Sequence, residues 1–171
     1  MDILTKINWV DILAVIIVVR ISYVALQDGL SHEIFPLVGT IATACISARY
    51  YNDLAVFIQG ITGVSVRSLE LFVFIILVLG IGLIFKLTKF LVDILLKVTW
   101  HPLVEKFGGL IFGLLRASVV VSIVLMAMSL TPFSYLQYSI KERSFSGPYF
   151  LKVVPEISSR VAWVFPATVK K

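Results

Sequence analysis

Four charged residues stand inside long apolar stretches or at their ends: Arg20, Glu33, Lys86 and Arg116. A charge at membrane depth is costly, so such residues usually pair with one another or line a polar pathway. If the apolar stretches form an antiparallel helix bundle, all four residues lie on the same membrane side. We expect either a buried ion pair, Glu33 with Arg116 or with Arg20, or independent charges that reach the lipid headgroups. The sequence leaves both interpretations open.

Residues that could carry other chemistry are few. His32 and His101 are the only histidines, and Cys45 is the only cysteine, so no intrachain disulfide can form. No HExxH, CxxC or nucleophile-elbow pattern is present. Asp11 and Glu70 stand near the starts of apolar stretches, where a carboxylate suits the helix dipole. We therefore predict no enzyme activity, no cofactor and no metal site.

The composition indicates an integral membrane protein. Of the 171 residues, 59% are hydrophobic, whereas soluble domains are usually about 45–50% apolar. The net charge of +5 is spread along the chain and forms no basic stripe of the kind that binds nucleic acid. The predicted partners are therefore the lipid bilayer and either further copies of this chain or other membrane proteins.

Four apolar stretches approach the length of about 20 residues that a membrane-spanning helix needs. They cover residues 9–26, 34–51, 69–85 and 105–130. The turn at 27–33 is short enough to allow only a tight hairpin. We expect a loose connection over 52–68, with a short interfacial helix at 54–58. We therefore expect an all-α, four-helix transmembrane bundle with both termini on one side of the membrane.

An amphipathic pattern continues beyond the third stretch. Apolar residues recur at helical spacing from Leu87 to Val98, and lysines line the opposite side. No helix breaker intervenes, so one helix could cover residues 70–100. The short basic loop that follows favours termini on the outer side of the membrane.

The end of the chain has a different character. Prolines divide residues 132–171, and we expect a short interfacial helix after Pro155. The sequence thus predicts a transmembrane domain over 1–131 and an amphipathic, Pro-punctuated tail over 132–171.

Small residues mark one face of the fourth stretch. Gly109 and Gly113 are four residues apart, and Ala117 extends the pattern by another turn. Such spacing lets a neighbouring helix approach closely in lipid. Arg116 lies on the same face at about 100° per residue, so we expect it to point toward protein.

The residues from 105 to 117 resemble the signature of the CvpA family, the colicin V production proteins. That signature is an acidic-basic pair, then Leu-Gly, then aromatic-Gly, then Arg followed by a small residue. Gly109, Phe112-Gly113 and Arg116 match it directly. Glu105-Lys106 stands where the family usually has Asp-Arg, and Ala117 stands where it usually has Gly.

A second match lies at the first turn. The family tends to show Gly, two residues, then Arg-Glu, and this chain has Gly29 followed by His32-Glu33. The resemblance covers roughly residues 9–130. It implies a bacterial inner-membrane protein, a non-enzymatic accessory or scaffold linked to toxin production or export and envelope homeostasis. The alternative is a small oligomeric channel or carrier that uses the charged layer.

Overall fold

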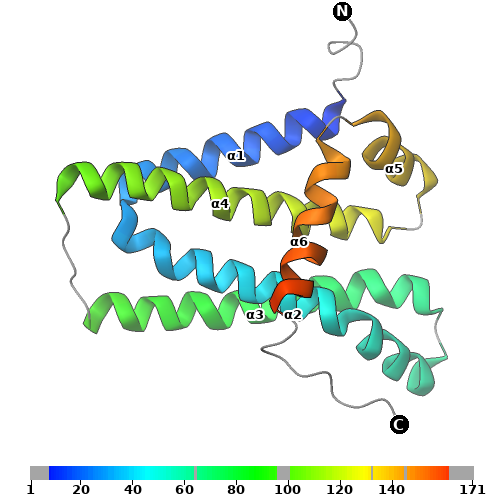
Figure 1. The fold of residues 1–171 in the computed structure, drawn as a ribbon. Helices are drawn as coiled ribbons and strands as arrows, with labels where there is room; N and C mark the ends of the chain where they lie inside the picture. Colours follow the sequence, from blue (N-terminus) through cyan, green and yellow to red (C-terminus); the bar gives the residue numbers. More distant parts are fainter. Residues whose placement is uncertain (1–7, 64, 96–100, 132, 145, 162–171) are drawn as a thin grey trace, which may run out of the picture.

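The computed structural model describes residues 8–63, 65–95, 101–131, 133–144 and 146–161 (Figure 1). Its four long helices are α1 (Trp9–Asp28), α2 (Leu30–Thr62), α3 (Val66–Leu95) and α4 (Pro102–Ser129). Three shorter elements follow: α5 (Ser134–Tyr138), the π-helical turn η2 (Ser139–Arg143) and α6 (Gly147–Val161). Each of the four long helices contains a stretch long and apolar enough to cross a membrane. The all-α class and the four membrane-length helices predicted from the sequence are thus confirmed.

The turn between α1 and α2 is sharper than predicted. Gly29 alone separates the two helices, with a positive φ of 83° that glycine adopts without a steric penalty. Since one residue makes the reversal, α2 begins at Leu30 rather than at 34.

The prediction for residues 52–68 was wrong, because α2 continues without a break to Thr62. Neither Asn52 nor Asp53 stops a helix that has tertiary support, and Ala55 is fully buried. The helix ends at Gly63, which takes the left-handed conformation while its N–H bonds to Gln59 O. No separate interfacial helix exists at 54–58.

The long helices lie side by side in one layer (Figure 1). In this layer α4 lies between α1 and α2, and α3 flanks α2 on the other side. The helix α6 crosses over α2 and α4. The first helix is therefore fixed mainly by α4, and the third mainly by α2.

Two clusters of buried apolar residues form the core. One joins α1, α4 and η2, and its members are Val10, Ala14, Val121, Leu125 and Ile140. The other joins α2, α3, α4 and α6, and its members are Ala44, Phe74, Val119, Ile123 and Val154. Both clusters include a residue from the predicted tail, so this tail does not lie apart from the bundle.

The helix in the tail also begins earlier than predicted. It starts at Gly147 and contains Pro155, the residue after which the sequence predicted it to start. The N–H of Val154 donates to Ser122 Oγ at 3.2 Å, which fixes α6 against α4 just before the proline. Burial of Val154 against α2 and α4 accounts for the difference.

The third helix runs unbroken into the amphipathic segment as far as Leu95. Leu87, Phe90 and Leu91 are exposed by 59% or more, so the apolar stripe faces away from the protein. Residues 96–100, including Lys97 and Val98 of the predicted segment, lie outside the described residues.

Candidate functional site

An ion pair between α2 and α4 is the centre of the candidate site. The Nη1 group of Arg116 donates to Glu33 Oε1 at 2.6 Å and to Glu33 Oε2 at 2.7 Å. The Glu33 side chain is 2% exposed and that of Arg116 is 21% exposed. Of the two partners that the sequence left open for Glu33, the structure brings Arg116 to it. Arg20 is exposed on α1 and does not join the pair.

The small residues of α4 lie where α1 approaches. A Cβ atom at Gly109 would lie 2.9 Å from the carbonyl carbon of Gly29 and still closer to Ala25 O. A Cβ atom at Gly113 would overlap the Cβ of Ala25. Ala117, one turn further, is fully buried. Any side chain at either glycine would push the two helices apart.

Glu105 of α4 reaches the start of α2. Its Oε1 accepts a hydrogen bond from the Ser31 N–H at 3.1 Å. The first N–H groups of a helix have no partner inside the helix. A carboxylate at this end therefore satisfies a hydrogen-bond donor and interacts favourably with the positive end of the helix dipole. A Cβ atom at Gly29 would lie 2.5 Å from Glu105 Cγ. Gly29 and Glu105, which match the family at distant positions in the sequence, therefore touch, whereas Lys106 points outward and is exposed.

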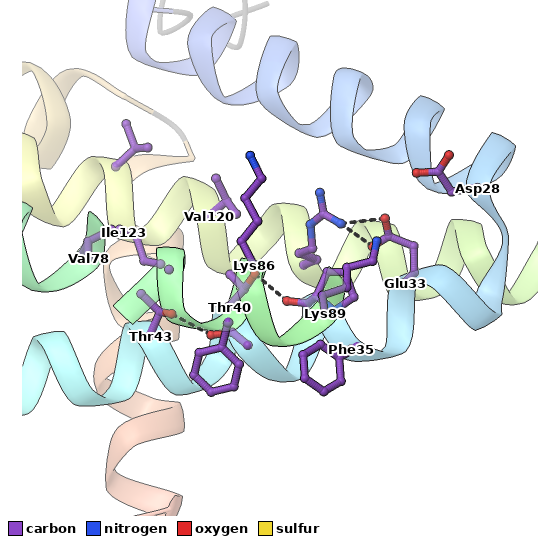
Figure 2. A pocket seen from close by; sticks show the side chains of 16 residues that line it. Asp28, Glu33, Phe35, Thr40, Thr43, Val78, Lys86, Lys89, Val120 and Ile123 are labelled. Atoms are coloured by element: carbon purple, nitrogen blue, oxygen red, sulfur yellow. Dashed lines mark hydrogen bonds and ion pairs between the residues drawn. The ribbon is translucent and has the colours of Figure 1, made fainter. Parts of the chain in front are cut away.

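A groove of about 550 Å³ opens beside the ion pair, between α2, α3 and α4 (Figure 2). We call it the α2–α3–α4 groove. Its charged and hydroxyl-bearing lining residues are Asp28, Glu33, Thr40, Thr43, Lys86, Lys89 and Arg116. The remainder of the lining is apolar or glycine, from Phe35, Pro36, Gly39, Val78, Gly82, Phe85, Val120, Ile123 and Val124. The Glu33–Arg116 pair thus stands in the wall of an open space.

The two threonines contribute little free hydrogen-bonding capacity to the groove. The Oγ1 of Thr40 donates to Pro36 O, and that of Thr43 donates to Gly39 O, both at 2.7 Å. The lysines differ, since Lys86 is exposed and Lys89 is half-buried. In Figure 2 the Lys89 side chain extends from α3 toward the Glu33 end of the groove.

Sequence reasoning missed part of this lining. The sequence pattern groups Lys86 with Glu33 and Arg116, but it places Lys89 only among the lysines on the polar side of the amphipathic segment. It gives no reason to assign Asp28, Thr40 or Thr43 to the site. The spacing of Lys86 and Lys89, three residues apart, was the available signal, because it places both on one helix face.

A second polar cluster lies at the start of α1 and joins it to the loop before α6. Asp11 Oδ1 accepts hydrogen bonds from Ser144 Oγ at 2.7 Å and from Ser146 N at 2.9 Å. Its Oδ2 accepts from the backbone N–H of Asn8 at 3.0 Å. Asp11 therefore joins the start of α1 to the loop before α6, besides its predicted place at a helix start.

Metal-ligating side chains do not gather in the part of the chain that the structure describes. No group of three or more His, Cys, Asp and Glu residues there could hold a metal ion. Cys45 is a buried free thiol on α2, and both His32 and His101 are exposed.

Comparison with known proteins identifies a family that this chain matches. A family model described as Colicin V production protein matches residues 10–155. Comparisons with curated proteins and with solved structures gave no match. The matched segment contains the ion pair, the small residues of α4 and the groove, and it extends beyond the predicted resemblance into α6. This membrane protein therefore belongs to the colicin V production protein family.

Proposed function

We propose that this protein is a non-enzymatic accessory or scaffold of the bacterial inner membrane. In this proposal it crosses the membrane four times and takes part in toxin production or export and in envelope homeostasis. The family match over residues 10–155 carries the proposal. The four membrane-length helices support the multi-pass arrangement.

The use of the charged residues also favours a scaffold. Glu33 and Arg116 join α2 to α4, and Glu105 joins α4 to the start of α2. Asp11 joins α1 to the loop before α6. These charged side chains, of types that act in catalysis in many enzymes, thus hold helices in place in this protein. That use is expected of a protein that works by presenting a fixed surface to partners.

The proposal is tested by complementation in a bacterial strain that lacks the gene. Toxin release and sensitivity to detergent are measured with the wild-type protein and with Glu33→Gln or Glu156→Gln. Glu156 is the matched control, because its salt bridge with Arg160 lies on the surface, with side chains 61% and 79% exposed. We expect Glu33→Gln to lose complementation and Glu156→Gln to retain it. Normal toxin release and a normal envelope in the deletion strain would contradict the proposal.

The α2–α3–α4 groove supports a second candidate, a small oligomeric channel or carrier. Lys86, Glu33 and Arg116 line an open space together, and membrane transporters use such intramembrane charges as pathways. The test is ion flux in vesicles reconstituted with the purified protein. Flux that exceeds that of empty vesicles and is lost in Arg116→Gln would favour this candidate over the scaffold. Flux equal to that of empty vesicles would favour the scaffold.

A further inference from the structure

We propose that the α2–α3–α4 groove binds one anionic phospholipid. Its phosphate would lie at Lys86 and Lys89, and one acyl chain would follow the apolar part of the groove. This inference goes beyond the proposed scaffold function, because it assigns a ligand class to a site that the scaffold role does not require.

The charges of the lining favour an anion. Arg116 and Glu33 neutralise each other through two short hydrogen bonds. Of the remaining charged lining residues, Lys86 and Lys89 are cationic and Asp28 alone is anionic, so the lining carries one net positive charge. Figure 2 shows Asp28 at the end of α1, beyond Glu33 and away from Lys86. A phosphodiester, with its single negative charge, complements the two lysines.

The depth of the lining matches a lipid rather than a small soluble anion. Lys86 and Lys89 lie in the last two turns of the apolar segment Ser68–Leu91, which places them near the headgroups. Val78 lies eight residues earlier on the same helix, about 12 Å deeper at about 1.5 Å per residue. The groove is therefore cationic at the interface and apolar toward the membrane interior. An anionic phospholipid has the complementary arrangement, with a negatively charged headgroup at the interface and apolar acyl chains below it.

The shape of the groove follows from the packing of the helices. In the layer α2 lies between α3 and α4, which barely touch each other, so α2 forms the floor and its neighbours form the walls. Gly82 of α3 lines this space, and a Cβ atom there would meet nothing within 4 Å. The volume of about 550 Å³ lies within the usual range of ligand sites, about 300–1,000 Å³. It accommodates a headgroup and part of one acyl chain.

The first test fills the groove from within. Gly82→Leu puts a side chain into the acyl path from a position where an added Cβ atom meets nothing within 4 Å, and Gly80→Leu is its control. Position 80 is equally open on the same helix but does not line the groove. Binding of phosphatidylglycerol to the purified full-length chain is measured by native mass spectrometry. We expect Gly82→Leu to weaken binding about tenfold, the effect of about two methylene groups losing their contacts. Gly80→Leu should bind as the wild type does.

The second test removes the headgroup contacts. The double variant Lys86→Gln, Lys89→Gln should lose the preference for phosphatidylglycerol over phosphatidylcholine. Lys106→Gln, an exposed lysine at the same membrane end but outside the groove, should keep this preference.

Three results would overturn the proposal. One is equal binding by Gly82→Leu and Gly80→Leu, and another is an equal loss of preference in Lys106→Gln and in the double variant. The third is evidence that a different ligand occupies the groove, for which there are two forms. Competition by free glycerol phosphate at the same concentration as the lipid would indicate a soluble anion. A dimer that Gly82→Leu converts to monomer, with lipid binding unchanged, would indicate a second copy of the chain.

Discussion

The ion pair between Glu33 and Arg116 should respond unequally to removal of its two members. Loss of one partner from a buried pair typically costs about 3–5 kcal/mol, because the other charge is stranded. In Arg116→Gln the stranded group is the Glu33 carboxylate, whose side chain is only 2% exposed, so we expect a loss in unfolding free energy of about 3–5 kcal/mol.

Removal of the acid should cost less. In Glu33→Gln the stranded group is a guanidinium that is 21% exposed and lines the open groove, so it is less desolvated than the Glu33 carboxylate. The loss should then approach the desolvation cost of one poorly satisfied polar group, about 1–3 kcal/mol. The double variant should recover part of the summed losses, with a coupling of about 0.5–3 kcal/mol.

The assay is reversible unfolding of the four proteins in mixed micelles, followed by circular dichroism. Glu156→Gln is the control, because an exposed i,i+4 pair contributes only about 0.3–0.5 kcal/mol. Additive losses in the double variant would show that the two residues act independently. A larger loss in Glu33→Gln than in Arg116→Gln would refute the reasoning from exposure.

Three further predictions concern contacts between helices. Gly113→Leu should destabilise the bundle by about 1–3 kcal/mol through overpacking against α1, and an unfolding curve like that of Gly80→Leu, where space is open, would contradict this. Glu105→Ala should cost about 1 kcal/mol by uncapping α2, whereas Lys106→Ala should leave stability unchanged, and equal effects in the same unfolding assay would exclude the cap. Asp11→Asn should speed proteolysis of the loop before α6, because three hydrogen-bond donors there lose a charged acceptor. Cleavage at the wild-type rate would show that this acceptor contributes nothing.

The sequence predicted the four membrane-length helices of the described residues, because long apolar runs of this kind are typical of helices that cross a membrane. It did not predict where α2 ends. The apolar content of a segment indicates where the hydrophobic run stops, but the helix itself ends only where the backbone leaves the helical conformation. Asn52 and Asp53 lower the hydropathy without breaking the helix, and Gly63 supplies the first conformation that does.

The partner of Glu33 and the groove depend on a different quantity, the rotation of each helix about its own axis. Arg20 and Arg116 both fall at the correct depth, and only the packing of α4 between α1 and α2 directs Arg116 toward the carboxylate. Likewise, Lys86 and Lys89 line a groove only because α3 and α4 stand on opposite sides of α2. Periodicity within one helix contains no information about that arrangement.

The hydrogen bonds of Asp11 set an order on the biogenesis of the protein. The Asp11 carboxylate is synthesised 133 residues before its partner Ser144. At about 5–20 residues per second of synthesis, the interval is on the order of ten seconds. During that time Asp11 lacks the hydrogen bonds from Ser144 and Ser146. These bonds form only after the loop before α6 has been synthesised. A chain that stalls before Ser144 keeps the local hydrogen bond from the Asn8 N–H to Asp11 but lacks the contact that joins the start of α1 to the loop before α6.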